Sequence, residues 1–207
     1  MTEARRYGVQ PEQPDGITPS QTVGPFFAYV LTPHDYATRA IFSNDIATPD
    51  AVGAPIRVEG YVIDGDGEPI VDAMIEIWQA DGEGRYASAA ARRGANTAFE
   101  GFGRTDLDAN GFYAFRTVKP GQVPGPSATR QAPHINVSIF ARGLLKQLFT
   151  RIYFEGEPAN ATDPILALVP EDRRQTLIAA RRERGSETVY TFNIRLQGED
   201  ETVFFES

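Results

Sequence analysis

The stretch that decides the fold class runs from residue 56 to residue 78 and reads IRVEGYVIDGDGEPIVDAMIEIW. Apolar and polar residues alternate in it on both sides of Asp64-Gly65-Asp66-Gly67, which is a strong turn signal. Alternation with a period of two is typical of half-buried β-strands, because successive side chains point to opposite faces. The stretch therefore predicts two strands joined as a β-hairpin with a longer loop.

Similar strand patterns recur toward the C-terminus. They cover residues 112–118, 134–142, 146–154 and 189–196. Residues 177–184 and 202–205 could add further strands, and Glu171-Asp172 after Pro170 could open a short helix. About eight short strands with little helix predict an all-β protein, a two-layer antiparallel β-sandwich or a barrel.

Two segments lie outside this pattern. Residues 1–20 contain Pro11, Pro14 and Pro19 with almost no apolar spacing, and they predict an extended N-terminal arm before a domain at 21–207. Residues 80–110 are polar and rich in Gly, Ala and Arg, which predicts a long loop. Loops of that length in a compact domain are often functional.

Composition excludes several classes of function. The chain of 207 residues has no cysteine, so disulfides, thiolate metal sites and cysteine nucleophiles are excluded. The 20 Lys and Arg residues against 28 Asp and Glu residues give a net charge of −8. A nucleic-acid-binding protein is expected to carry a basic surface, so this charge argues against that class. No apolar run has the roughly 20 residues of a membrane span, and no signal peptide is evident, so we expect a soluble cytoplasmic protein.

Two residues are candidate metal ligands. His134 and Asn136 share one face of a predicted strand, but an amide is a weak ligand for a transition metal. A hydrogen-bonded structural histidine is the alternative for His134. Tyr86 lies in the long loop, and a phenolate can bind ferric iron, whereas ordinary amphipathic packing is the alternative.

Arg142 is a candidate for binding a carboxylate. An arginine near a strand end suits bidentate capture of such a group, and a surface ion pair is the alternative. Arg142 follows His134 by eight residues, roughly 26 Å along an extended strand, so the two cannot serve one small pocket. Gly24-Pro25 predicts a tight turn where backbone can approach another group closely.

Several short motifs together resemble the intradiol ring-cleaving dioxygenases, and the resemblance extends from about residue 18 to the C-terminus. The motifs are TPSQT at 18–22 before Gly24-Pro25, EIWQAD at 76–81, FGRT at 102–105, TVKPG at 117–121, APHIN at 132–136, FARG at 140–143, and QG at 197–198 before ETVFF at 201–205. Within the family, the chain is similar to alpha subunits of heteromeric enzymes that cleave protocatechuate. The resemblance implies a β-sandwich.

The resemblance also implies a non-haem Fe(III) held by two Tyr and two His of a homologous beta subunit. The four corresponding positions here carry Tyr86, Val123, His134 and Asn136. An arginine near the iron in the iron-bearing subunits corresponds to Gln131. Two of the four ligands are therefore missing, which implies that this chain binds no metal and that the partner beta subunit holds the iron.

The role implied by the resemblance is to complete the partner's substrate pocket. Thr22, Gly24 and Pro25 would approach the aromatic ring, and Arg142 would lie near the substrate carboxylate. Phe26 departs from the Tyr that alpha chains often carry there. The implied reaction is O2-dependent intradiol cleavage of protocatechuate to 3-carboxy-cis,cis-muconate. The alternatives are an autonomous dioxygenase and a non-enzymatic β-sandwich module that binds an aromatic acid or a partner beside Tyr86 and His134.

Overall fold

A computed structural model describes residues 31–32, 42–49, 51–87 and 99–206 of the chain. The predicted arm at 1–20 and the positions of Thr22, Gly24, Pro25 and Phe26 lie outside the described residues. Among the described residues, none of the helices has the length and apolar character needed to cross a membrane.

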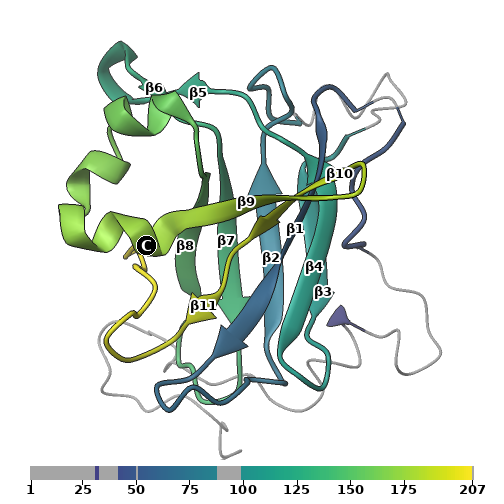
Figure 1. Ribbon diagram of the computed structural model, residues 1–207, viewed down its shortest axis with the longest axis vertical. Coiled ribbons are helices and arrows are strands. Elements are labelled where there is room, and N and C mark those ends of the chain that lie inside the picture. The colour runs from purple at the N-terminus through teal and green to yellow at the C-terminus, as the bar shows by residue number, and fades with distance from the viewer. Residues whose placement is uncertain (1–30, 33–41, 50, 88–98, 207) are drawn as a thin grey trace, which may run out of the picture.

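The described residues form strands connected by loops and short 3₁₀ turns (Figure 1). The strands are β1 (Pro55–Ile63), β2 (Met74–Gln79), β3 (Phe102–Asp106), β4 (Phe112–Val118), β5 (Val123–Pro124), β6 (Arg130–Gln131), β7 (His134–Phe140), β8 (Leu148–Phe154), β9 (Ile178–Arg184), β10 (Glu187–Thr191) and β11 (Ile194–Arg195). The 3₁₀ turns are η3 (Pro126–Ala128), η4 (Pro158–Thr162), η5 (Leu166–Leu168) and η6 (Glu171–Leu177).

The strands build a β-sandwich, as predicted. One layer contains β11, β1, β10 and β9 with β4 paired to β1, and the other contains β8, β7, β2 and β3. Strand β9 joins the layers through a short parallel pairing with β8. The inward faces of both layers share one core, in which Val58 and Phe115 of the first layer meet Ile75 and Ile135 of the second. Burial of these apolar faces supplies the main driving force for folding.

The predicted hairpin of residues 56–78 is wrong, although both of its strands exist. Strand β1 pairs with β4, β10 and β11, whereas β2 pairs with β3 and β7. The connecting segment does not keep the two strands side by side, so each finds partners far away in the sequence. Three pairings, β1–β10, β1–β11 and β8–β9, are parallel, so the sheet is mixed rather than purely antiparallel.

The long predicted loop at 80–110 contains strand β3, which sequence alternation did not reveal. Gly103 occupies an inward position of β3, where a Cβ atom would lie 3.1 Å from the backbone oxygen of Ser43. The close approach explains why glycine stands where an apolar residue would have marked a strand. Residues 202–205 form only an isolated bridge, between Phe205 and Phe149, rather than a full strand.

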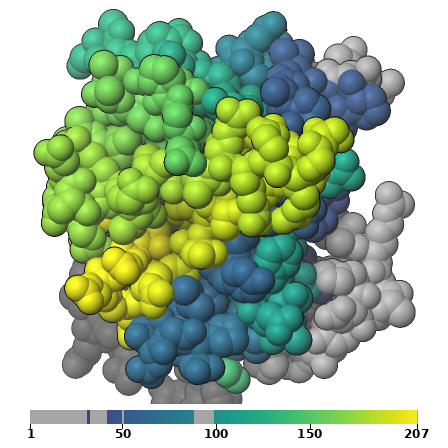
Figure 2. Space-filling view, in the orientation of Figure 1, coloured from purple at the N-terminus to yellow at the C-terminus, as the bar shows by residue number. Residues whose placement is uncertain are grey.

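The ambiguous segment at 170–184 contains both a helical turn and a strand. Turn η6 begins at Glu171 after Pro170, and β9 begins at Ile178. Turns η4 to η6 lie beside β8, on the left in Figure 1. A second, smaller apolar cluster contains residues of these turns and of β8, among them Leu177 and Tyr153. The C-terminal part of the chain, green to yellow in Figure 2, covers the front of the earlier strands.

Candidate functional site

The candidate ligand positions of β7 lie on the outward face of the second layer. Strand β7 pairs with β2 on one side and with β8 on the other. The register places Asn136 between Trp78 of β2 and Arg151 of β8, and it places His134 opposite Tyr153. Residues paired in register project to the same side of a sheet. These side chains therefore lie on one face in two adjacent rows, Trp78–Asn136–Arg151 and His134–Tyr153.

His134 is 3% exposed and has a backbone partner. Its Nδ1 atom lies 2.7 Å from the carbonyl oxygen of Ala132, so the Nδ1–H donates to that carbonyl and the neutral tautomer carries its lone pair on Nε2. Burial lowers the pKa of the His134 imidazole, and the nearby positive charge of Arg151 lowers it further. The ring is therefore uncharged at neutral pH.

Tyr86 packs against an aromatic neighbour and remains protonated. Its ring lies 4.7 Å from that of Trp78, centroid to centroid, at an interplanar angle of 36°. Burial raises the pKa of the Tyr86 phenol, and the opposing effects of the Asn136 side chain and of Arg151 do not cancel this rise. A metal ion would have to displace this proton to bind the oxygen as a phenolate.

Val123 and Gln131 are cross-strand partners in the small β5–β6 ribbon. Val123 is 3% exposed, and its side chain has no atom that could bind a metal. The Gln131 amide nitrogen donates to the carbonyl of Pro124 at 2.9 Å, and its oxygen accepts from Arg151 Nη1 at 2.7 Å. The arginine beside these positions thus comes from β8 rather than from residue 131.

These residues do not fit a ferric ion. The four positions supply one imidazole, one phenol, one amide and one hydrocarbon side chain, whereas Fe(III) favours anionic oxygen and imidazole donors, so only two of the four are suitable ligands. The guanidinium of Arg151 adds a positive charge that acts on both Tyr86 and His134. Within the described part of the chain, no group of three or more His, Cys, Asp or Glu side chains is placed to hold a metal ion.

Sequence reasoning missed Arg151, Tyr153 and Asp163, which shape this region. Asp163 is 1% exposed and accepts hydrogen bonds from the Tyr153 hydroxyl at 3.0 Å and from the backbone N–H of Ala132 at 2.7 Å. It also accepts from the backbone N–H of Leu166 at 2.7 Å. This carboxylate therefore ties η5 to the segment that leads into His134. An aspartate followed by Pro164 signals a turn in the sequence, but not this long-range contact.

Arg142 lies at the opposite end of β7 from His134. His134 is the first residue of the strand, and Arg142 follows its last residue by two positions. The Arg142 side chain is 84% exposed, and its Nε atom lies 3.0 Å from a carboxylate oxygen of Asp72. The separation of the two residues agrees with the distance argument from the sequence. The structure thus contains the surface ion pair that is the alternative to carboxylate capture, and the guanidinium is exposed.

A family model described as "Dioxygenase" matches residues 23–198 of the chain. The protocatechuate 3,4-dioxygenase alpha chain of Burkholderia cepacia is 48% identical over 195 residues, which cover 91% of this chain and 96% of the relative. The chain belongs to the intradiol dioxygenase family.

Two further members of the intradiol dioxygenase family place the chain within it. The protocatechuate 3,4-dioxygenase beta chain of Burkholderia cepacia is 37% identical over 77% of this chain and 71% of its own length. The solved dioxygenase domain of a dioxygenase–carbohydrate-binding protein fusion from Streptomyces sp. SirexAA-E superposes with a TM-score of 0.59 at 26% identity. That match covers 88% of this chain and 100% of the solved one. The chain is thus more similar to the alpha relative than to the beta relative.

Proposed function

We propose that this chain is the alpha subunit of a heteromeric protocatechuate 3,4-dioxygenase and that it completes the substrate pocket of a homologous, iron-bearing beta subunit in the cytoplasm. The observation that carries the proposal is the match to an alpha chain, which covers 96% of that relative. The candidate ligand positions of this chain, which include the buried hydrocarbon side chain of Val123, also do not fit iron. The beta relative matches at lower identity and over less of the chain, as expected of a paralogous partner.

Arg142 supports a role in binding the substrate carboxylate. Its ion pair with Asp72 uses the Nε atom, and the side chain is 84% exposed, so the guanidinium is accessible to a planar carboxylate. The neighbouring side chains of Val71 and Leu145 are 51% and 64% exposed, so apolar surface is available there for a partner chain. Thr22, Gly24 and Pro25, which would approach the aromatic ring, lie outside the described residues.

The contribution of this chain to the reaction is then positional. In the proposed complex the beta subunit holds Fe(III). Ring cleavage adds both atoms of O2 across the bond between the two hydroxyl-bearing carbons of protocatechuate and yields 3-carboxy-cis,cis-muconate. Arg142 fixes the carboxylate and hence the orientation of the ring, and the surrounding surface keeps water out. Holding a reactant in one orientation removes part of the entropic barrier to reaction.

The alternative of a ligand bound beside Tyr86 and His134 has less support. Tyr86 stacks on Trp78, and Arg151 is engaged by Gln131, so these side chains satisfy one another. The arrangement resembles a packed polar region more than an open pocket.

The test of the proposed role compares two substrates in the complex. We expect Arg142→Ala to raise the KM for protocatechuate about tenfold or more, because a charge-assisted contact contributes about 1.5–3 kcal/mol. Catechol has no carboxylate, so its KM should change little. The matched control is Arg116→Ala, which removes an exposed arginine paired with Asp45. Equal effects of Arg142→Ala on both substrates would exclude this role.

A further inference from the structure

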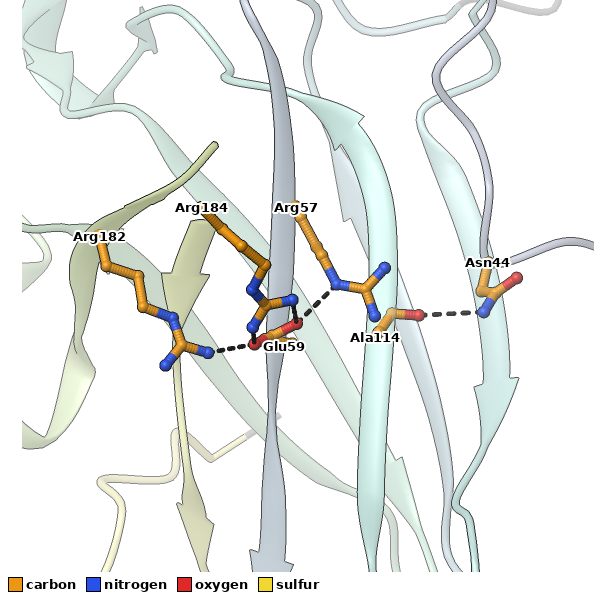
Figure 3. A network of polar contacts seen from close by, with 6 residues as sticks. All are labelled: Asn44, Arg57, Glu59, Ala114, Arg182 and Arg184. Carbon is orange, nitrogen blue, oxygen red and sulfur yellow. Dashed lines mark hydrogen bonds and ion pairs between the residues drawn. The ribbon is translucent and has the colours of Figure 1, made fainter. Parts of the chain in front are cut away.

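The outer face of the first layer carries a cluster of arginines around one buried carboxylate. The Glu59 side chain of β1 is only 3% exposed, and Arg57, Arg182 and Arg184 converge on it from β1 and β9 (Figure 3). Arg57 Nε lies 2.6 Å from one carboxylate oxygen, and Arg184 Nη2 lies 2.5 Å from the other. Arg182 Nη2 also donates to Glu59. Both carboxylate oxygens are therefore occupied by guanidinium groups.

The cluster keeps an excess of positive charge. Three guanidinium groups face Glu59, and Glu187 is the other carboxylate that acts on Arg184, so three positive and two negative charges leave +1. Each guanidinium has five N–H donors, and one carboxylate cannot accept them all. The side chains of Arg182 and Arg184 are each 51% exposed. The cluster thus presents oriented N–H donors to solvent while Glu59 holds the arginines in place.

A hollow of about 320 Å³ lies beside this cluster. The three arginines and Glu59 form part of its wall. The rest of the wall is formed by Gly60, Tyr61, Phe112, Thr191 and Asn193. The Tyr61 and Phe112 rings pack together with centroids 5.3 Å apart, and Tyr61 is 45% exposed. The hollow therefore combines an aromatic wall with a cationic wall.

We propose that this hollow binds a small planar aromatic carboxylate, with the carboxylate on the arginines and the ring against Tyr61 and Phe112. An inorganic anion would use only the arginines, and a neutral aromatic molecule would use only the rings. A benzoate-sized molecule uses both, and it fits the available volume. The site goes beyond the proposed function, since its residues belong to β1, β4, β9 and β10 and to the segment after β10 and include none of the candidate site residues.

The test is isothermal titration calorimetry with the full chain in the assembly in which it purifies. The probes are benzoate, benzamide, acetate and inorganic phosphate. We expect saturable benzoate binding. Benzamide lacks the carboxylate, and acetate and phosphate lack the ring, so each of these three should bind at least about tenfold more weakly than benzoate. Phosphate or acetate binding as tight as benzoate binding would overturn the aromatic assignment, and absence of saturable benzoate binding would overturn the site itself.

Variants locate the binding to this hollow. Tyr61→Ala and Arg182→Gln should each weaken benzoate binding about tenfold or more. Arg181→Gln is the matched control, because it removes the same charge from the adjacent position of β9, where Arg181 pairs with Glu183 instead. Arg142→Gln controls for binding at the proposed substrate pocket. Tyr61 is exposed, so its replacement tests the site even if Arg182→Gln perturbs folding. Unchanged affinity in both hollow variants, or loss in Arg142→Gln alone, would contradict the proposal.

Discussion

The guanidinium of Arg151 donates a hydrogen bond of 2.7 Å to the side-chain oxygen of Gln131, and this contact joins β8 to the β5–β6 ribbon. It places a fixed positive charge beside Asn136, its register partner on β7. The same charge acts on both Tyr86 and His134, the two residues that the sequence resemblance predicts to match metal ligands. The positive charge of Arg151 thus lies among the candidate ligand positions.

The first prediction concerns the titration of His134. Burial and Arg151 both lower its pKa, so we expect an NMR titration midpoint below the ordinary value of 6.5. Arg151→Gln should raise the midpoint without restoring it fully, because burial remains. The chain has two histidines, so the resonance that remains in His34→Gln is that of His134. A midpoint above 6.5, or one that does not respond to Arg151→Gln, would contradict this account of the site.

A second prediction concerns restoration of metal binding. Val123→Tyr with Asn136→His returns the missing ligand types, but Arg151 still opposes a trivalent cation. We expect the double variant to bind ferric iron weakly and the triple variant with Arg151→Gln to bind it at least about tenfold more tightly, a gain of roughly 1.4 kcal/mol. The readouts are metal content and tyrosinate-to-iron absorption. Arg116→Gln added to the double variant controls for total charge, and equal gains from both additions would refute the local role of Arg151.

A third prediction concerns the buried carboxylate of Asp163. Asp163→Asn replaces one acceptor oxygen by an N–H donor, so at least one of its partners among Tyr153, Ala132 and Leu166 loses its bond. We expect the free energy of unfolding to fall by about 2–3 kcal/mol. Tyr153→Phe removes the bond to Asp163 and a long contact of 3.5 Å from Arg151, and it should lower the free energy of unfolding by about 1 kcal/mol. Urea denaturation measures both. A smaller loss in Asp163→Asn than in Tyr153→Phe would show that the carboxylate is not the centre of this network.

A fourth prediction concerns stability in acid. Burial raises the pKa of Glu59, but hydrogen bonds from Arg184, Arg57 and Arg182 outweigh it and lower the pKa from 4.5 to about 2. The folded state therefore binds fewer protons than the unfolded state between these values. The resulting stability is present above pH 4.5 and is lost as the pH falls toward 2. We expect a contribution of about 2 kcal/mol, less than the full shift implies because Arg182 and Arg184 are half exposed.

Denaturation curves between pH 5 and pH 2 in wild type and Glu59→Gln measure this contribution. The variant should be less stable at pH 5 and should approach the wild type as the pH falls, because its amide does not titrate. A constant difference between the two proteins across this interval would show that Glu59 is not ionised preferentially in the folded state.

Alternation in the sequence predicted the strands more successfully than their pairing. The patterns at 56–62 and 134–142 overlap β1 and β7, although β7 ends at Phe140, because apolar residues facing one core must recur every second position. Pairing depends on contacts far apart in the chain: Glu59 faces Ala114 on one side and Thr191 on the other. No local pattern around the Asp64–Gly67 turn encodes those partners.

The candidate site can be predicted only in part from the sequence, for the same reason. Residue chemistry and strand spacing point to Tyr86, His134 and Asn136, family motifs add Val123, and the structure shows which groups surround them. Arg151 could not be found that way, since its place beside Asn136 follows from the β7–β8 register rather than from a motif. The arginine cluster around Glu59 was hidden too, because it joins β1 to residues more than 120 positions later.

The measurement that tests the central claim most directly is iron content with protocatechuate-dependent oxygen uptake. It is made on this chain alone and on the chain co-expressed with a candidate beta subunit. We predict neither iron nor oxygen uptake for the lone chain, and both for the complex. Iron and turnover in the lone chain would contradict the account, because Val123 and Asn136 would then stand in a working metal site.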